Sequence, residues 1–317
     1  MSEELNPITP FDRTPKRLAG YGKEHPSGKW PGGAKVAVSF CLNYEEGGEY
    51  SIRNGDAWHQ RQFQEYENGV TESVPKVGVV DPAVESQYSY GSRAGVWRIF
   101  KAFKDRGMVL CLYGVASALA QSPNVTKKAL EYGFECGSHG GRWIQHATIP
   151  AEEESAQIAE GLKVWMSQGP APVGWFYGRP SAESSYLVLE EYKKLGLPPI
   201  KWWSDLYSDD VPHWRPRPGG KKDEGKFSRP NGWRSPKVYG DHLIAAFDEL
   251  WEEAERTGTD KMMTIGLHCR VIGKPARIGA LTRFLDHLKA KGAWVTTREA
   301  IADHWTSLYP YDPEAAW

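Results

Sequence analysis

The stretch Val36–Glu49 reads VAVSFCLNYEEGGE and carries more information about the fold than any other part of the chain. Its first half is a mostly apolar run, which predicts a buried strand. Its second half places three carboxylates and two glycines directly after that strand, where burial can tune acid and base groups. Taken alone, the stretch also fits a polar loop that closes a hairpin. Similar polar clusters follow other apolar runs and favour one assembled site: Ser138–Trp143, Tyr177–Pro180, Ser204–Asp205 and Leu267–Arg270.

Outward from this stretch, strand-like and helix-like segments alternate along the chain. Short apolar runs predict seven strands, at Val36–Leu42, Val109–Tyr113, Phe134–Gly137, Val173–Tyr177, Ile200–Ser204, Met262–Leu267 and Ala293–Thr296. Helical spacing predicts helices at Arg93–Arg106, Val115–Leu119, Lys127–Tyr132, Ala151–Ser167, Ser184–Leu195, Leu243–Arg256, Ala276–Lys291 and Arg298–Ser307. This alternation predicts an α/β fold with a parallel sheet covered by helices, and it favours a barrel. A doubly wound open sheet is the alternative, but no G-x-G-x-x-G motif follows the first strand.

The regular alternation also divides the chain. Residues 1–33 are rich in Pro and Gly and are predicted to form an extended N-terminal arm, and residues 34–317 a single catalytic barrel. Two segments interrupt the alternation, at about 47–90 and 206–241. Insertions of this length are usually lids, binding loops or interface arms.

Composition excludes several classes of function. The 317 residues carry a formal net charge of −1, which provides no overall field to attract nucleic acid or an anionic membrane, so a small-molecule substrate is the default partner. No apolar stretch is long enough to span a membrane, and the N-terminus lacks the basic and apolar regions of a signal peptide, so we expect a cytoplasmic protein. The four cysteines contain no C-x-x-C pair, which argues against a zinc ribbon.

A series of short motifs runs along most of the chain in one order. They are Gly20–Gly22, Leu42–Glu49, Tyr90–Arg98, Ser138–Gly140, Arg142–Ile144, Gly174–Trp175, Gly178–Arg179, Asp209–Asp210, Pro212, Trp214, Ile265–Arg270 and Ile272–Gly273. Together these motifs resemble the NodB-type polysaccharide deacetylase superfamily, and within it the metal-independent, allantoinase-like branch. The resemblance implies a distorted, incomplete (β/α)7 barrel, hydrolysis of an amide in a small ring, and a homo-oligomer, commonly a tetramer.

The residues at the family's metal site differ from those of the sugar deacetylases. Those enzymes hold a divalent metal with an Asp and two His spaced H-x-x-x-H, and use a neighbouring Asp as base. This chain has Asn43 and Glu45 in place of the two acids, keeps His139, and has Trp143 in place of the second His. Because tryptophan offers no ligand atom to a metal, we expect no cofactor. The alternative is a divalent metal such as zinc near Glu45 and His139, for which His146 would have to replace the missing ligand.

Hydrolysis without a metal needs a base and donors that stabilise an oxyanion. We predict Glu45, His139 and His268 as catalytic residues, because the histidines titrate near neutrality and a carboxylate can act as base or orient a histidine. The rigid fork of Arg179 can clamp a ureide or carboxylate oxygen, although it can equally pair with a structural carboxylate. The predicted substrate-binding residues are Asn43, Glu46, Trp143, Arg179, Asp205, Asp209 and Arg270.

Two departures from the allantoinase pattern leave the substrate open. Residues 215–227 are polar where that branch has an apolar strand, and Gly141 stands where it tends to carry Tyr. We therefore predict a hydrolase that opens a C–N bond in an allantoin-like ureide or a cyclic imide. The alternatives are a metal-dependent N-deacetylase of amino-sugar polymers and a catalytically inactive, ligand-binding barrel.

Several aromatic residues lie outside the regular alternation of strands and helices. The arm and the first insertion contain Tyr21, Trp30, Tyr50, Trp58, Phe63, Tyr66, Tyr88 and Tyr90. Such side chains need apolar cover, for which we expect a partner subunit. The alternative is that the arm folds back and plugs the bottom of its own barrel.

Overall fold

The computed structural model describes residues 25–60, 77–206, 209–214 and 235–311. Its centre is one sheet of seven strands, each of which lies where the sequence predicts a strand. All of the recorded strand pairs are parallel. The strands are β1 (Val36–Tyr44), β2 (Cys111–Gly114), β3 (Glu135–Ser138), β4 (Gly174–Trp175), β5 (Trp202–Trp203), β6 (Lys261–His268) and β7 (Trp294–Val295).

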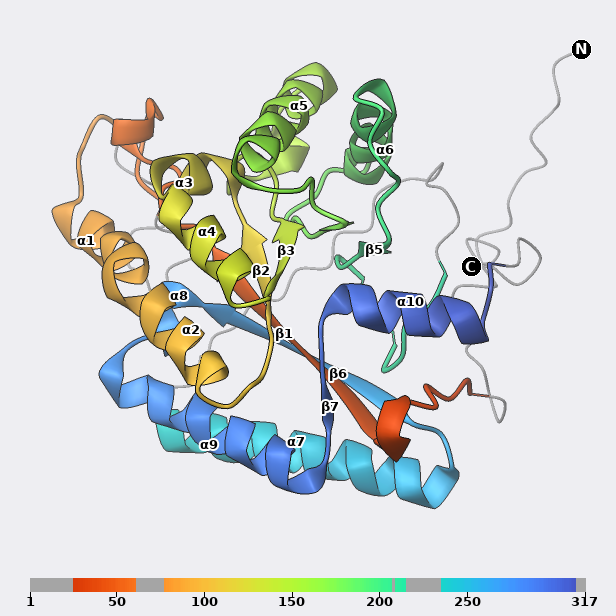
Figure 1. Ribbon diagram of the computed structural model, residues 1–317. Helices are drawn as coiled ribbons and strands as arrows, with labels where there is room; N and C mark the ends of the chain where they lie inside the picture. Colours follow the sequence, from red (N-terminus) through yellow and green to blue (C-terminus); the bar gives the residue numbers. More distant parts are fainter. Residues whose placement is uncertain (1–24, 61–76, 207–208, 215–234, 312–317) are drawn as a thin grey trace, which may run out of the picture.

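The sheet is curled but not closed. Its order is β5-β4-β3-β2-β1-β6, and β7 pairs with residues 37–38 of β1. Since β6 pairs with β1 over residues 36–43, β2 and β7 share the other edge of β1. No pairing joins β5 to β6 within the described residues, and helices pack against the outside of the sheet (Figure 1). This curled half-barrel confirms the predicted distorted, incomplete (β/α)7 barrel of NodB type.

The helices follow the predicted order, with three differences. α7 begins at Pro236 rather than Leu243, and the predicted helix at Arg93–Arg106 begins instead with a π-helical turn, η4 (Gly91–Gly95). Two helices, α1 and α8, were not predicted; α1 lies inside the predicted insertion at 47–90. The α-helices of the described residues are α1 (Pro82–Tyr90), α2 (Val96–Lys104), α3 (Ala116–Gln121), α4 (Pro123–Glu131), α5 (Ala151–Gln168), α6 (Ser184–Lys194), α7 (Pro236–Thr257), α8 (Cys269–Ile272), α9 (Pro275–Lys291) and α10 (Arg298–Leu308).

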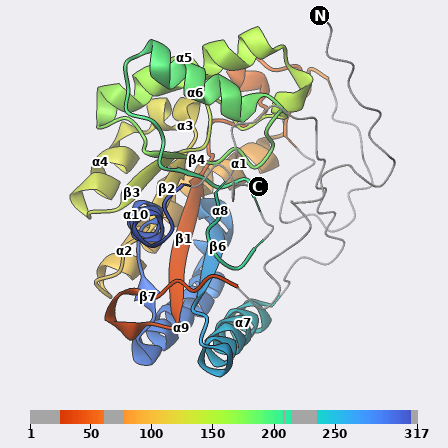
Figure 2. The ribbon, with the colours of Figure 1, turned by 90° about the vertical axis from the view of Figure 1, so that its right-hand side faces the viewer.

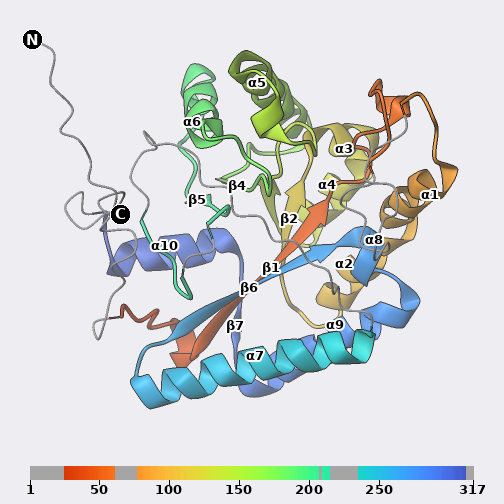
Figure 3. The same ribbon diagram turned by 180° about the vertical axis from the view of Figure 1, so that it is seen from behind.

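The residues of β1 alternate between two buried faces. Val36, Val38, Phe40, Leu42 and Tyr44 belong to the large outer core, where α7 and α9 lie side by side beneath the sheet (Figure 3). The residues between them are smaller and face the concave side. Because successive side chains of a strand point to opposite faces, Asn43 is the last strand residue of β1 on the concave side.

The same alternation brings side chains of three other strands to the concave side. Asn43 lies opposite Tyr113 of β2 and opposite His268 of β6 in the strand register. Gly137 of β3 lies opposite Tyr113, so His139 follows two residues later on the same face. The concave side of the sheet therefore ends in a cluster of polar side chains at the carboxyl ends of the strands.

α10 and part of the arm fill the lower half of the concavity. Figure 2 shows α10 nearly end-on beside β1. Trp30 is 2% exposed, packs against Trp294 and Trp305, and donates from Nε1 to the Lys261 carbonyl oxygen at 2.6 Å. Its cover is intramolecular, which corrects the expectation of a partner subunit for this residue and agrees with the fold-back alternative. Tyr88 is likewise buried, whereas Tyr21, Phe63 and Tyr66 lie outside the described residues.

The two predicted insertions are described in part. Of the segment at about 47–90, residues 61–76 lie outside the described residues, and of 206–241 so do 207–208 and 215–234. Among the helices of the described residues, none combines the length and apolarity needed to cross a bilayer.

Candidate active site

Glu45 stands at the centre of the polar cluster. It follows β1 directly, and its side chain is 1% exposed. Its Oε1 atom lies 3.1 Å from Nε2 of His139 and 3.3 Å from Nε2 of His268, while Oε2 accepts a hydrogen bond from Nη1 of Arg270 at 2.7 Å. The three residues predicted as catalytic are thus brought together, with Arg270 as a fourth member.

These contacts decide the charge of Glu45. Burial alone would raise the pKa of the Glu45 carboxyl, but its electrostatic interactions with His268 and Arg270, with the hydrogen bond to His139, hold it well below its usual range. Glu45 is therefore ionised at neutral pH and can only accept hydrogen bonds.

His139 is held on both sides of its ring. It follows β3, is 1% exposed, and its Nδ1 lies 3.1 Å from the carbonyl oxygen of Phe176. A carbonyl oxygen and an ionised carboxylate both only accept, so each ring nitrogen of His139 faces a hydrogen-bond acceptor. These two contacts fix the orientation of the His139 ring.

His268 is the accessible member of the cluster. It is the last residue of β6, and its side chain is 30% exposed, against 1% for Glu45 and His139. Its Nε2 also lies 3.2 Å from Nδ2 of Asn43, whose Oδ1 is buried with no hydrogen-bond partner in the described parts of the chain. When Nε2 of His268 carries a proton and donates it to Glu45, Nε2 cannot accept from Nδ2 of Asn43. A rotation of the Asn43 amide by 180° places Oδ1 next to Nε2 instead, and an oxygen suits this contact. In this tautomer Nδ1 is the proton-accepting nitrogen of His268.

Two arginines enclose Trp143. The Arg179 guanidinium carbon lies 4.2 Å from the centre of the indole and that of Arg270 lies 5.0 Å from it, and Arg270 also stacks on Tyr88 at 4.5 Å. Nη2 of Arg179 donates to the Trp143 carbonyl oxygen at 3.1 Å. Burial lowers the pKa of Arg179 to about 10, so both guanidinium groups stay charged at neutral pH. The position of the family's second metal-binding histidine is therefore flanked by cations.

Glu46 is a second buried carboxyl beside Arg270. Its Oε2 accepts a hydrogen bond from the backbone N–H of Glu45 at 3.1 Å, and its Oε1 lies 3.7 Å from Nη1 of Arg270. Burial raises the pKa of Glu46 to about 7; Arg270 opposes this shift and the charge of Glu45 adds to it. At neutral pH, Glu46 therefore exchanges a proton where Glu45 does not.

Asp205 and Asp209 lie in different places. Asp205 follows β5, and its two oxygens accept from the backbone N–H groups of Tyr177 and Gly178 at 2.9 and 2.6 Å. It thereby holds the turn that leads to Arg179, so its observed contacts are those of a positioning residue and not of a substrate ligand. Asp209 precedes Asp210, whose carbonyl accepts from Met262 at the amino end of β6. The structure therefore places Asp209 at the opposite end of the sheet, away from the other predicted residues.

Two residues near the site were not among the predicted site residues. Tyr88 supports Arg270 from α1, in a segment without strong helical periodicity in the sequence. His146 was considered only as a replacement metal ligand, but it stacks on Tyr177 at 4.1 Å and donates its backbone N–H to the Arg179 carbonyl oxygen. Burial and the charge of Arg179 lower the pKa of His146 to about 3, which keeps it neutral. Its spacing from His139 in the sequence gave no signal for this role.

The side chains present do not fit the divalent metal of the sugar deacetylases. Trp143 offers no ligand atom, and the atoms of Glu45 and His139 that would bind a metal bond to each other. A guanidinium already occupies the second oxygen of Glu45 and would repel a dication. In the described part of the chain no three His, Cys, Asp or Glu side chains are grouped to hold a metal.

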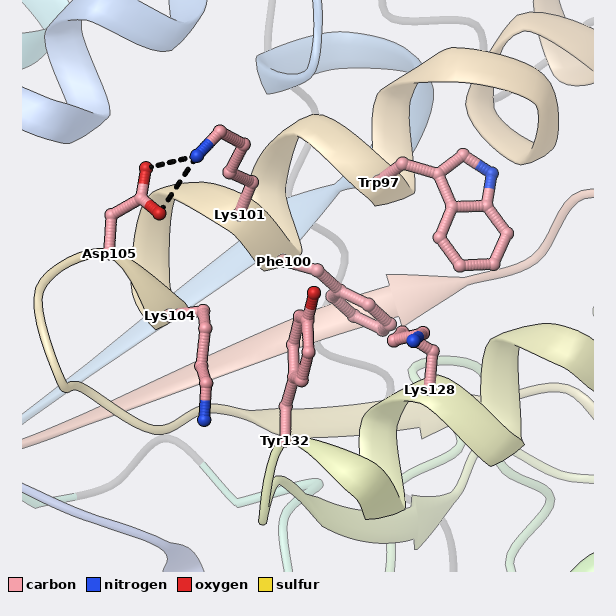
Figure 4. A pocket seen from close by; sticks show the side chains of 7 residues that line it. All are labelled: Trp97, Phe100, Lys101, Lys104, Asp105, Lys128 and Tyr132. Atoms are coloured by element: carbon pink, nitrogen blue, oxygen red, sulfur yellow. Dashed lines mark hydrogen bonds and ion pairs between the residues drawn. The ribbon is translucent and has the colours of Figure 1, made fainter.

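A surface hollow lies elsewhere, between α2 and α4 (Figure 4). It has a volume of about 260 Å³, and none of the predicted site residues lines it. Its lining residues are Trp97, Phe100, Lys101, Lys104, Asp105, Lys128 and Tyr132. The polar cluster at the strand ends is thus the candidate active site.

A curled parallel half-barrel with a histidine–carboxylate cluster at its strand ends defines a NodB-like protein. The chain belongs to the polysaccharide deacetylase superfamily: it is 36% identical over 316 residues to "Putative polysaccharide deacetylase" of Schizosaccharomyces pombe, an alignment that covers 92% of this chain and 96% of that protein. No family model matches the chain.

Two solved structures are similar over nearly their whole length. One is a "probable Polysaccharide deacetylase" from Pseudomonas aeruginosa PAO1, at 36% identity and a TM-score of 0.82, covering 93% of this chain and 99% of that one. The other is PuuE allantoinase, also at 36% identity and a TM-score of 0.82, covering 93% of this chain and 98% of that one.

Proposed function

We propose that this protein is a hydrolase that opens a ring C–N bond of a small cyclic amide, an allantoin-like ureide or a cyclic imide, without a bound metal. The observation that carries the proposal is the Glu45 carboxylate, which contacts both imidazoles through one oxygen and Arg270 through the other. A carboxylate that orients a partly exposed histidine is the arrangement of a general base.

The chemistry follows from the exposure and tautomers of these groups. Glu45 orients Nε2–H of His268, so that Nδ1 takes a proton from water as the water oxygen bonds to the ring carbonyl carbon. The tetrahedral intermediate then collapses, the C–N bond breaks, and the proton passes from His268 to the leaving nitrogen. The products are a carboxylic acid, which ionises, and, on the same opened molecule, a ureido group from a ureide or a carboxamide from an imide. His139 stays behind Glu45 as its buried hydrogen-bond partner.

The guanidinium groups supply the positive charge of the site. As water adds, the carbonyl oxygen becomes an oxyanion, which fixed cations in a buried site stabilise strongly. Arg270 forms an ion pair with Glu45, and Arg179 lies over the Trp143 ring and donates to the Trp143 carbonyl oxygen. We assign Arg179 to the oxyanion and the product carboxylate, and Asn43 and Trp143 to the ring of the substrate.

The relatives support this class of reaction. Deacetylases and allantoinases both hydrolyse carbon–nitrogen bonds, and PuuE allantoinase is a similar structure over nearly the whole chain. The residue at position 141 does not select the substrate ring. A Cβ at Gly141 would lie 2.6 Å from the Gln157 carbonyl oxygen of α5, so this position faces α5 and not the polar cluster at the strand ends. Residues 215–227 lie outside the described residues. The proposed partners are a small-molecule substrate and further copies of the chain, with a tetramer favoured and the cytoplasm as location.

A substrate panel with two histidine variants tests the proposal. The wild-type protein is incubated with allantoin, hydantoin, dihydrouracil and succinimide, and separately with acetylated chito-oligosaccharides, and ring opening and acetate release are measured. His268→Ala should lose ring opening by about 10²–10⁴-fold. His287→Ala, which removes a histidine of α9 that has similar exposure and pairs with Asp248 of α7, should leave it unchanged.

Other outcomes would favour the alternatives. Acetate release without ring opening would support a metal-dependent N-deacetylase. If the wild type binds a ring compound but turns over none, and His268→Ala behaves in the same way, the protein is an inactive, ligand-binding barrel.

A further inference from the structure

The helix that precedes the second strand contains an unusual turn close to the active site. α1 and α2 are joined by η4, a π-helical turn with the sequence Gly91-Ser92-Arg93-Ala94-Gly95. π-Helical turns are rare and often accompany functional sites. None of these five residues belongs to the proposed catalytic or substrate-binding set.

One end of η4 is in backbone contact with α8. A Cβ atom at Gly95 would lie 2.2 Å from the carbonyl oxygen of Cys269, and one at Gly273 would lie 2.5 Å from Cα of Gly95. Because backbone atoms cannot swing aside, only glycine allows this approach. Arg270 lies on α8, so this contact sets how closely the helix that carries Arg270 packs against η4.

The other end of η4 touches Glu46. A Cβ at Gly91 would lie 2.1 Å from Oε1 of Glu46 and 2.5 Å from its Cδ. Gly91 has a φ of −58°, which any residue adopts, so glycine is needed here for space and not for conformation. Any side chain at position 91 would therefore displace the Glu46 carboxyl.

That carboxyl has a task in the site. Glu46 is 4% exposed, and its Oε2 accepts the backbone N–H of Glu45. Its Oε1 has no hydrogen-bond partner in the described parts of the chain and rests against Gly91. Contact with Gly91 on one side and the hydrogen bond to Glu45 on the other define the position of the Glu46 side chain.

We propose that Gly91 is a positioning residue: the space above it seats the Glu46 carboxyl, which holds the Glu45 backbone and so places the Glu45 carboxylate between the two histidines and Arg270. The proposal rests on the proposed function for its activity readout. Its physical content, a steric coupling between positions 91 and 46, is independent of the substrate.

The test introduces a steric clash between positions 91 and 46 and then relieves it with a second substitution. Gly91→Ala adds a methyl group where the carboxyl lies, and Glu46→Asp shortens that side chain by one methylene. We expect Gly91→Ala to lower kcat for ring opening by about 100-fold, the cost of a misplacement near 1 Å, with little change in KM. The double variant Gly91→Ala/Glu46→Asp should regain about tenfold over Gly91→Ala. Gly279→Ala is the control, because it adds a methyl group to an exposed helical glycine that has open space around it.

Thermal melting of all four variants measures the steric coupling between positions 91 and 46 without a substrate. Gly91→Ala should lower the melting temperature, and Glu46→Asp should restore part of that loss in the double variant but lower the melting temperature when introduced alone. If the wild type opens no ring, the proposed function fails while this melting comparison still decides the positioning. Wild-type kcat and melting in Gly91→Ala, or no recovery of either in the double variant, would overturn the proposal.

Discussion

Replacing Glu46 by glutamine should stabilise the protein at alkaline pH although it removes a charge next to an arginine. Glu46 is buried, and its carboxylate gains only one backbone hydrogen bond and a distant ion pair of 3.7 Å with Arg270. Glutamine has the same shape, accepts the same backbone N–H through its amide oxygen, and stays neutral at every pH.

The size of the effect follows from the pKa. Burial raises the pKa of Glu46 from 4.5 to about 7, and this difference of about 2.5 corresponds to about 3 kcal/mol. Because the folded state binds the proton more tightly than the unfolded state, the stabilisation is complete below about pH 4.5 and is lost as the pH rises to about 7. Glu46→Gln does not undergo this loss.

Urea unfolding from pH 4.5 to 8.5 measures the difference. Glu46→Gln should match the wild type near pH 4.5 and exceed it by up to about 3 kcal/mol at pH 8. Glu252→Gln, at an exposed position of α7, is the control and should track the wild type throughout. A gap between Glu46→Gln and wild type that does not change with pH, or a less stable variant at pH 8, would refute the reasoning.

Four further variants probe other parts of the structure. Arg270→Met should cost about 3–5 kcal/mol in urea unfolding at pH 8, because it leaves the Glu45 carboxylate buried without its cation; a cost below about 1 kcal/mol would contradict the ion pair. Asp205→Asn should lower kcat/KM for ring opening and cost about 1–3 kcal/mol of unfolding free energy, because one of the two backbone N–H groups then faces an amide nitrogen. Asp209→Asn should leave kcat/KM unchanged, and equal losses in the two variants would place both residues in the site. Trp30→Ala should cost about 3–5 kcal/mol of unfolding free energy, and a variant as stable as the wild type would show that the arm is not part of the core.

Most of the fold was predictable because its signal is local. The seven strands are short apolar runs between helical segments, and hydrophobic periodicity reports them directly. α1 was not predicted because its sequence, PAVESQYSY, has little apolar periodicity, and its stability comes from the burial of Val84 and Tyr88. The π-helical turn was not predicted either, and its two glycines lie against Glu46 and Cys269, which are distant in sequence.

The candidate site was predictable as a set of strand ends, but not as a set of partners. Alternation along β1 and β6 and the common edge of parallel strands bring Asn43, Glu45, His139 and His268 together. That Arg270 binds Glu45 and that Asp205 binds backbone depends on side-chain directions in turns, which no sequence pattern records. Asp209 was predicted to bind substrate because its stretch matches the allantoinase-like branch, whereas the carbonyl oxygen of its neighbour Asp210 accepts a hydrogen bond at the start of β6.

The central claim is that Glu45, His139 and His268 open a cyclic amide without a metal. The most direct test is the rate of ring opening by the wild-type protein before and after dialysis against a strong chelator, with zinc then added back. The account predicts the same rate in all three samples. Loss of ring opening after chelation, with recovery on adding zinc, would contradict it.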